Sequence, residues 1–474
     1  MDLTRQRLLY ILFDYLMAAV GWAVFNILRY YTLPPELWTA SLSDFLCSSP
    51  LVLGQILIPI GMVLLYALAG SYNRRNTLYR SRLDEVLTSA WVSFGGMIGI
   101  YFAVLINDNI PERITNYELA LMMWLCLFIP TAVCRMIEVT KAARATRRGN
   151  LVMPTLVIGA NSGNARRIKR LQASSRYTGL RITACMTDDP DMSSILGPEV
   201  EIHALDSDIA ELCRRTGTRA VILLPSKADL TDTVKAINTV FPLDIPIFIS
   251  PDLMSLIAFR PHVSSVIGEP LIDISRANIS PFALNSKRLS DIIVSSFTLL
   301  LLSPLFAALA IAVRLDSPGP ALYRQRRVGL HKKPFTIYKF RTMRVDAEPN
   351  GPELTGESDP RVTRLGRFLR KYRLDELPQF WNVLRGDMSL VGPRPEREYF
   401  IRQLVAYQPA YTLVHQMRPG ITSWGMVKYG YASDISQMLE RLPYDLLYIE
   451  NVSLGVDLKI LFHTVSTVLG GRGQ

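Results

Sequence analysis

KRLSDIIVSSFTLLLLSPLFAALAIAVR, residues 287–314, is a long apolar run with a proline in its middle and basic residues before and after it. Its apolar part, Ile292–Val313, has the length that a helix needs to cross a hydrocarbon core, about 20 residues. A simple span would place one basic flank on the non-cytoplasmic side, which is disfavoured. Pro304 removes a backbone donor, and the Ser303 hydroxyl can bond to a carbonyl that is thereby freed. We therefore predict a re-entrant membrane helix over 288–314, with a fifth span kinked by proline as the alternative.

Four further apolar stretches fill the first 140 residues. They run at Leu8–Leu28, Leu51–Ala69, Val86–Leu105 and Leu119–Cys134. Lys and Arg gather in the leader, in the second loop and after the fourth stretch, so the positive-inside rule places the N-terminus and everything after the fourth span in the cytoplasm. We expect Asp14, inside the first stretch, to form either an intramembrane functional site or a helix–helix contact.

The composition favours spanning helices combined with soluble domains. Of the 474 residues, 49% are hydrophobic, which is high for a soluble protein and low for a pure membrane bundle. The net charge of +11 suits anionic lipid, phosphorylated substrates or nucleic acid, but no nucleic-acid module is recognisable, so nucleic acid is not an expected partner. The five cysteines form no CxxC pair, which indicates neither a disulfide framework nor a zinc site.

A central domain of the α/β class is predicted over residues 150–272. Short β-branched runs at 155–159, 219–224 and 245–249 alternate with polar helical segments, as in a Rossmann-like parallel sheet. The turn Gly159–Gly163 lacks the spacing GxGxxG, so a turn that needs small residues for packing is favoured over a nucleotide site.

The segment 364–379 joins a basic helix to a pair of carboxylates. Leu365, Phe368, Leu369 and Tyr372 recur at helical spacing among basic residues, which predicts an amphipathic helix suited to a membrane interface. Asp375 follows it and has the sequence context of a helix N-cap, where a carboxylate has a lowered pKa and stays ionised. An ionised Asp can attack phosphorus, and an adjacent carboxylate can hold Mg²⁺.

Six motifs occur in order around this pair: Gln325-Arg-Arg327-Val-Gly329, Tyr338-Lys339-Phe-Arg341-Thr-Met343, Leu374-Asp375-Glu376-Leu-Pro-Gln379, Asn382-Val-Leu-Arg-Gly386-Asp387-Met-Ser-Leu, Val391-Gly-Pro-Arg394-Pro395 and Arg418-Pro-Gly420-Ile-Thr422. Here the chain resembles the polyprenyl-phosphate hexose-1-phosphate transferases of the monotopic phosphoglycosyl transferase superfamily. The likeness covers roughly 286–469. The whole chain is similar to the long undecaprenyl-phosphate glucose and galactose phosphotransferases of exopolysaccharide synthesis.

The resemblance implies roles for individual residues. Asp375 matches the nucleophile that forms a covalent phosphosugar intermediate, Glu376 matches its partner linked to Mg²⁺, and both are candidate metal ligands. Ser303 and Pro304 match the break in a re-entrant helix. The implied substrate-binding residues are Arg327, Lys339, Arg341, Arg370, Gln379, Asp387, Arg394 and Arg418. One departure is the segment Ser423-Trp424-Gly425-Met426, where the family has Gly-Trp-Ala-Gln or Gly-Leu-Trp-Gln.

These observations predict a four-helix transmembrane domain (1–140), a Rossmann-like α/β domain (150–272) and a mainly α catalytic domain (284–474) with a re-entrant helix. By resemblance, this would be a transferase of the bacterial inner membrane, with its catalytic domain on the cytoplasmic face. It would move a hexose-1-phosphate from UDP-glucose or UDP-galactose to undecaprenyl phosphate and release UMP. Its partners would be these substrates, Mg²⁺, membrane lipid and, as an option, a second copy of itself. The alternatives are a membrane-bound NAD(P)-dependent enzyme that modifies nucleotide sugars, and a non-catalytic scaffold for polysaccharide assembly.

Overall fold

The structure is a computed structural model. It describes residues 3–33, 41–72, 82–105, 113–224, 236–250, 271–275, 279–344, 359–430, 432 and 434–469. Two compact units make up the chain: residues 1–153 with 170–181, and most of the remainder. Each is described by itself.

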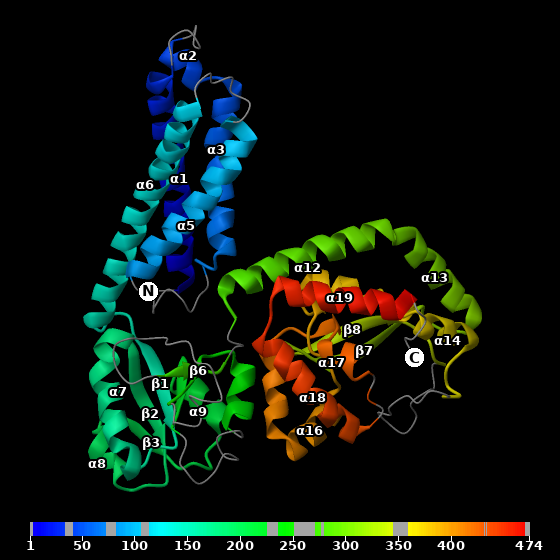
Figure 1. Ribbon diagram of the computed structural model, residues 1–474. Helices are drawn as coiled ribbons and strands as arrows, with labels where there is room; N and C mark the ends of the chain where they lie inside the picture. The colour runs from blue at the N-terminus through cyan, green and yellow to red at the C-terminus, as the bar shows by residue number, and fades with distance from the viewer. Residues whose placement is uncertain are drawn as a thin grey trace. The chain divides into compact units, whose positions relative to one another are not determined.

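The N-terminal unit is a helical bundle (Figure 1). Its elements are α1 (Leu3–Thr32), α2 (Leu42–Leu46), α3 (Ser49–Leu68), α5 (Arg82–Ile100), extended by a π-turn to Leu105, and α6 (Arg113–Arg147). Four of these helices are long and apolar enough to cross a membrane, which confirms the four predicted stretches. Large apolar side chains such as Leu64 (59% exposed) and Trp91 (71%) point out of the bundle, as a lipid environment requires.

A buried ionic cluster ties the bundle helices together. Arg135 of α6 donates from Nε and Nη2 to Asp14 of α1 at 2.9 and 2.6 Å, and from Nη1 to Glu85 of α5 at 3.0 Å. The hydroxyl of Tyr72 donates to Asp14 at 2.7 Å, and Arg135 lies 3.7 Å from the centroid of the Tyr66 ring. Asp14 therefore makes the helix–helix contact that was one of its two interpretations.

A six-stranded sheet forms the centre of the chain. Its strand order is β3-β2-β1-β4-β5-β6. β4 pairs in parallel with both of its neighbours, β1 and β5, whereas β6 pairs with β5 in the antiparallel direction. The elements are β1 (Met153–Ile158), α7 (Ala165–Thr178), β2 (Leu180–Met186), α8 (Met192–Leu196), β3 (Glu201–His203), α9 (Ile209–Arg215), β4 (Ala220–Leu223), β5 (Ile247–Ile249) and β6 (Ile272–Asp273). The three predicted strands are confirmed as β1, β4 and β5.

The C-terminal region is mainly helical, as predicted, but it also contains two small sheets that the sequence analysis missed. The elements are α12 (Pro281–Leu301), α13 (Ser303–Asp316), β7 (Leu322–Val328), β8 (Pro334–Phe340), α14 (Arg364–Lys371), α15 (Gln379–Arg385), β9 (Ser389–Val391), α16 (Glu398–Tyr407), β10 (Gly420–Thr422), α17 (Trp424–Lys428), α18 (Ile435–Glu450) and α19 (Leu454–Leu469). β7 and β8 form an antiparallel hairpin, and β9 pairs with β10 in parallel. The core lies among α15, α16, α18 and the β9–β10 pair.

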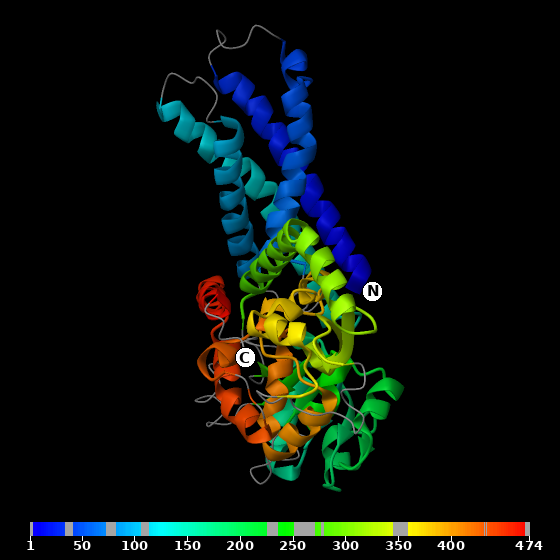
Figure 2. The ribbon, with the colours of Figure 1, turned by 90° about the vertical axis from the view of Figure 1, so that its right-hand side faces the viewer.

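The apolar run 287–314 lies in two helices, α12 and α13, and the chain bends by 64° between them (Figures 1 and 2). The break falls at Leu302, two residues before Pro304. The Ser303 hydroxyl donates to the Leu300 carbonyl at 2.8 Å, which confirms the predicted role of that serine.

Both ends of this bent pair are bound to the same C-terminal region. At the start of α12, Lys287 pairs with Asp457 of α19 at 2.6 Å, and Arg288 donates to the last carbonyls of α15. At the end of α13, Arg341 donates to the Ser317 carbonyl at 2.6 Å. Phe306 of α13 also packs against Phe340 of β8, with ring centroids 5.9 Å apart.

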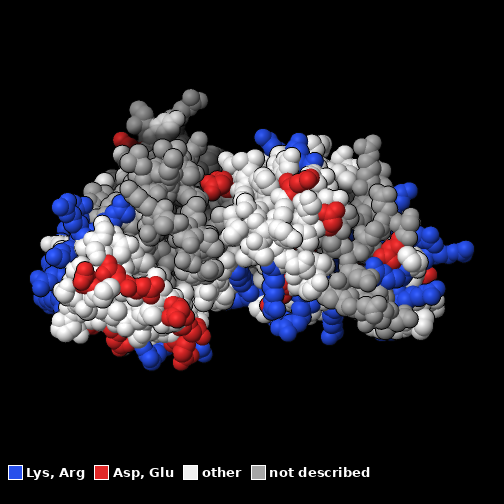
Figure 3. Space-filling model, turned by 90° about the horizontal axis from the view of Figure 1, so that it is seen from below, with Lys and Arg blue, Asp and Glu red and all other residues white. Residues whose placement is uncertain are grey.

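Figure 3 shows one face of the protein in space-filling form. Among the described residues on that face, Lys and Arg side chains lie in separate groups, and Asp and Glu lie between several of them. The described Lys and Arg side chains drawn there form no single patch.

Candidate active site

The two adjacent carboxylates lie in a tight turn between α14 and α15. Arg373, two residues after the end of α14, has a left-handed backbone (φ 52°), and Leu374–Glu376 then form a 3₁₀ turn. Pro378, not Asp375, occupies the N-cap position of α15, so the predicted N-cap at Asp375 is wrong. The left-handed residue reverses the chain after the helix, which brings both carboxylates into a buried position.

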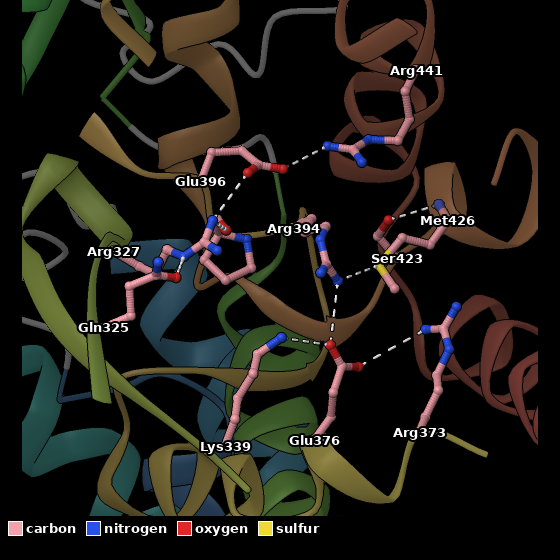
Figure 4. Close-up of polar contacts among 11 residues, drawn as sticks. Gln325, Arg327, Lys339, Arg373, Glu376, Arg394, Glu396, Ser423, Met426 and Arg441 are labelled. Atoms are coloured by element: carbon pink, nitrogen blue, oxygen red, sulfur yellow. Dashed lines mark hydrogen bonds and ion pairs between the residues drawn. The ribbon is translucent and has the colours of Figure 1, made fainter. Parts of the chain in front are cut away.

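Three cations surround the Glu376 carboxylate (Figure 4). Lys339 Nζ lies 2.9 Å from Oε1, Arg394 Nη1 lies 3.7 Å from Oε1, and Arg373 Nη1 lies 4.0 Å from Oε2. They come from β8, from the loop after β9 and from the end of α14. Burial alone would raise the pKa of Glu376, but these cations hold it well below its usual range.

Asp375 has a different environment from its neighbour. It is 8% exposed, and within the described residues its carboxylate forms no ion pair and no hydrogen bond to another side chain; its own backbone N–H is the hydrogen-bond donor that acts on it. Burial, and then the charge of Glu376, raise the pKa of Asp375 to about 6. The expectation of a lowered pKa is therefore wrong, because the N-cap donors on which it rested are not there. At neutral pH the group is still mostly ionised.

The β7–β8 hairpin carries two of the predicted site residues. Lys339 lies opposite Tyr323 near the open end of the hairpin, and Arg327 lies opposite Phe335 near its turn. Asn382 of α15 holds β8 in place, because its side chain accepts from the backbone N–H of Tyr338 at 3.1 Å and also donates to a carbonyl of the strand. This contact fixes Lys339 relative to the turn that holds Glu376.

The loop after β9 places Arg394 on the other side of Glu376. Gly420 donates its backbone N–H to the Pro393 carbonyl at 2.9 Å, and Gly392 donates to the Thr422 carbonyl at 3.0 Å. A Cβ at Gly420 would lie 2.1 Å from the Gly392 nitrogen, so only glycine allows this approach. The side chain of Arg394 extends from this loop and lies between Glu376 and α17.

The segment Ser423–Met426, whose sequence differs from the family pattern, also contacts Arg394. The Ser423 hydroxyl caps α17 by accepting from the Met426 N–H at 2.9 Å. The Met426 sulfur lies 3.5 Å from Arg394 Nη1, so the arginine has a weak acceptor on this side.

Behind Arg394 lies a buried ionic chain that the sequence analysis missed. Glu396, which is 4% exposed, accepts from Arg327 Nη1 at 3.1 Å and from Arg441 Nη2 at 3.0 Å. Arg441 Nε in turn lies 3.6 Å from Asp445. One signal was available in the sequence. Arg441 and Asp445 stand four residues apart on the same face of α18 as Met438 and the other apolar side chains buried there, where unpaired charges are costly.

The other predicted substrate-binding residues make mostly structural contacts. Arg341 donates to backbone carbonyls at the end of α13, and Arg418 Nε donates to the Gly386 carbonyl at 3.0 Å. Arg370 Nε donates to the Thr342 hydroxyl at 3.0 Å, and its charge also acts on Asp375. Gln379 is buried, and Asp387 lies 3.7 Å from Arg385. The structure thus gathers Lys339, Arg373 and Arg394 around the carboxylates, with Arg327 behind Arg394.

The donor set of the turn fits Mg²⁺. Within the described residues there is no cluster of three or more His, Cys, Asp or Glu side chains. Mg²⁺ does not need one, because it prefers oxygen ligands, keeps several waters and is usually held by one or two carboxylates together with substrate phosphates. Asp375 and Glu376 provide those two carboxylates in one turn.

Comparison with known proteins identifies the region that contains this turn. Residues 282–471 match the family model of the bacterial sugar transferases. The exopolysaccharide production protein PSS of Rhizobium leguminosarum bv. phaseoli is 40% identical over 194 residues, which are 40% of this chain and 97% of that protein. The chain belongs to the bacterial sugar transferase family. The resemblance inferred from the six motifs is thereby confirmed.

Other bacterial sugar transferases are similar over the same region. The UDP-N-acetylgalactosamine-undecaprenyl-phosphate N-acetylgalactosaminephosphotransferase of Aeromonas hydrophila is 45% identical over 194 residues, 41% of this chain and 46% of that one. The UDP-glucose:undecaprenyl-phosphate glucose-1-phosphate transferase of Escherichia coli K12 is 38% identical over 221 residues, 46% of this chain and 48% of that one. The match to this chain spans about half the length of these curated relatives.

Proposed function

We propose that this protein transfers a hexose-1-phosphate from a UDP-sugar to undecaprenyl phosphate and releases UMP, as the first membrane step of exopolysaccharide, capsule or O-antigen synthesis. The observation that carries the proposal is the unequal environment of the two carboxylates. Three cations hold Glu376, whereas Asp375 forms no ion pair or hydrogen bond with another side chain within the described residues. A carboxylate that is buried, mostly ionised and not paired with another side chain is available as a nucleophile.

The reaction proceeds in two displacements. A carboxylate oxygen of Asp375 attacks the sugar-bearing phosphorus, the bond from that phosphorus to the bridging oxygen breaks, and UMP leaves with the electron pair. A phosphate oxygen of the lipid then attacks the same phosphorus and releases the Asp375 carboxylate. Lys339, Arg373 and Arg394 stabilise the negative charge that moves between the phosphates. Mg²⁺, held by Glu376 and Asp375, would neutralise part of the donor diphosphate.

The bent helix pair is proposed to be a re-entrant hairpin. A straight helix of its combined length would extend about 50 Å, at 1.5 Å per residue, and its ends would lie on opposite sides of a bilayer. Instead, Lys287 and Arg288 tie its start, and Arg341 ties its end, to the same C-terminal region. Phe297 (63% exposed) and Leu300 (78%) near the bend face outward, as lipid contact requires. We accordingly propose an inner-membrane protein with a cytoplasmic catalytic face and with the three domains 1–140, 150–272 and 284–474.

The turn after β1 favours this function over a nicotinamide-dependent enzyme. In a dinucleotide site, the backbone N–H groups of this turn bind a pyrophosphate. Here the Ser162 N–H donates to the Asp189 carboxylate at 2.7 Å. The N–H groups of Asn161 and Asn164 are taken by each other's side chains. The chain's own acceptors thus occupy the donors that a cofactor would need, although the Rossmann-like class of the domain stays a proposal.

Asp375→Asn tests the function. Purified full-length protein in nanodiscs receives undecaprenyl phosphate, Mg²⁺ and, one at a time, UDP-glucose, UDP-galactose and UDP-N-acetylgalactosamine, and released UMP is measured. Wild type should release UMP with at least one donor, and Asp375→Asn should release none. Asp206→Asn, at an exposed aspartate of the central domain, is the control and should match wild type. A scaffold would give no UMP with either protein, and Asp375→Asn with normal release would refute the nucleophile.

The quaternary state is tested separately. A homodimer is proposed as the alternative to a monomer, and multi-angle light scattering of the detergent-purified protein distinguishes the two masses.

A further inference from the structure

The residues on both sides of Arg394 are held by other elements, so its position depends on them. The Glu396 carbonyl accepts from the Val328 N–H at 3.1 Å, and Arg327 Nη1 donates to the Pro395 carbonyl at 3.0 Å. These two contacts bind the loop to β7 after Arg394, while the Pro393 carbonyl binds it to β10 before Arg394. The loop backbone at Arg394 is therefore fixed, and its guanidinium can move only by rotation within its own side chain.

Three arginines converge on this loop, and one carboxylate lies among them (Figure 4). The charge of Arg394 opposes the charged forms of both Arg327 and Arg441, so Arg394 is close enough to repel each of them. Glu396 interacts favourably with all three. Arg441 is buried and Arg327 is largely so, with 15% of its side chain exposed, so removal of the carboxylate charge leaves like charges unpaired in a region of low dielectric.

This arrangement links Glu396 to the acid pair through a single side chain. Arg394 is the member of the arginine group that also reaches Glu376, at 3.7 Å. When the other two arginines are neutralised, Arg394 is free to direct its charge at Glu376 and at a substrate phosphate there. When they are not, their repulsion weakens the contact of Arg394 with Glu376.

We infer that Glu396 is a positioning residue of the donor site, which acts through Arg394 by neutralising Arg327 and Arg441. The inference rests on the proposed function, since it concerns how the donor diphosphate is held. Glu396 itself contacts no reacting atom. Its effect should therefore appear mainly in the KM for the UDP-sugar and should depend on the presence of Arg394.

A double-mutant cycle separates this role from a purely structural one. The variants are Glu396→Gln, Arg394→Gln and the double variant, each assayed for UMP release and for UMP binding by thermal shift. Glu396→Gln should lower kcat/KM by about 10- to 100-fold, the range found when the outer partner of a catalytic ligand is removed. In the Arg394→Gln background the same change should cost less than about twofold. The control is Glu398→Gln, because Glu398 is an exposed carboxylate two residues away, paired only with the exposed Arg402 among the described residues.

Each outcome decides the inference. Losses that add in the double variant, or a Glu396→Gln enzyme within twofold of wild type, overturn it. Where Glu396→Gln does not fold, Arg441→Lys keeps the buried charge but loses the planar fork of donors, and it should raise the KM for the UDP-sugar with little change in kcat. A loss confined to kcat in that variant also overturns the inference. A wild type that releases no UMP from any donor overturns the proposed function instead, and the inference with it.

Discussion

Replacement of Lys339 by methionine should slow UMP release by about 10- to 150-fold. Lys339 Nζ lies closer to Glu376 than the other two cations do, at 2.9 Å against 3.7 and 4.0 Å. At an effective dielectric constant of 20, these separations correspond to gross attractions of about 6, 4.5 and 4 kcal/mol, so Lys339 supplies roughly two-fifths of the total. Desolvation offsets most of this, and a hydrogen bond to a charged group is worth about 1.5–3 kcal/mol net. Because 1.36 kcal/mol is tenfold in rate, that net range gives the expected slowing.

The assay is single-turnover UMP release from the full-length protein in nanodiscs, at saturating UDP-sugar and Mg²⁺. These conditions isolate the first displacement from lipid binding. The matched control is Lys333→Met, because Lys333 lies on the turn of the same hairpin but is 58% exposed and pairs with Asp244, far along the chain from the acid pair. The control should release UMP at the wild-type rate.

Two results would refute the reasoning. If Lys339→Met kept a rate within threefold of wild type, the nearest cation would not contribute to the chemistry. If Lys339→Arg fully restored the rate, position would matter less than charge, since the larger, planar guanidinium cannot occupy the place of the ammonium without moving the turn.

Three further predictions follow from other parts of the structure. Arg135→Met should lower the melting temperature of the protein in detergent, because it leaves two buried carboxylates without their shared cation, a loss of about 3–5 kcal/mol. Burial lowers the pKa of His415 to about 3, whereas its pKa in the unfolded state is near 6.5, so acid favours the unfolded state, which binds the extra proton. The contribution of His415 to the free energy of unfolding should be complete above pH 6.5 and fall by about 1.4 kcal/mol per pH unit as the pH drops toward 3. Chemical unfolding of wild type and of His415→Gln measures this slope. Gly420→Ala should reduce UMP release at least tenfold, because its Cβ would collide with the Gly392 backbone and separate β9 from β10.

Matched substitutions serve as controls for these predictions. Arg144→Met removes an exposed arginine from the same helix as Arg135, and Gly455→Ala adds a methyl group whose nearest neighbour is 4.0 Å away. Both should leave stability and UMP release unchanged. A His415→Gln protein that loses stability with acid as steeply as wild type would show that this histidine is not the group responsible.

The parts of the fold that sequence alone predicted are those with a strong local period. The four spans follow from runs of about 20 apolar residues, and α14 follows from apolar residues at helical spacing. The break at Ser303-Pro304 follows from the missing proline donor, and the strands β1, β4 and β5 follow from short β-branched runs between polar helices. In each of these, the physical cause lies within one segment.

The missed features depend on contacts between distant segments. Glu396 meets Arg327 across 69 positions and Arg441 across 45, and nothing in the local sequence pairs them. The hairpin β7–β8 carries charged side chains along an exposed strand, so it lacks the alternation that marks a half-buried strand. The pKa of Asp375 was misjudged for a related reason. The same local sequence suits an aspartate at a helix N-cap and an aspartate buried in a turn. The left-handed backbone of Arg373, which reverses the chain after α14, places Asp375 in the buried turn.

In the proposed function, the charges around the acid pair suit one pocket to a soluble donor and a lipid acceptor in turn. Lys339, Arg373 and Arg394 surround Glu376, and the charge of Arg370 acts on Asp375. Four cations thus face two carboxylates, and a buried excess of like charge is costly unless an anion offsets it. A donor diphosphate supplies that anion, and when UMP departs, the excess returns. The pocket is then complementary to the next phosphate that arrives, which on a protein with outward-facing apolar helices is the headgroup of a lipid. In the proposed function, each phosphate substrate thus meets the same excess of positive charge in turn, first the donor diphosphate and then the lipid phosphate.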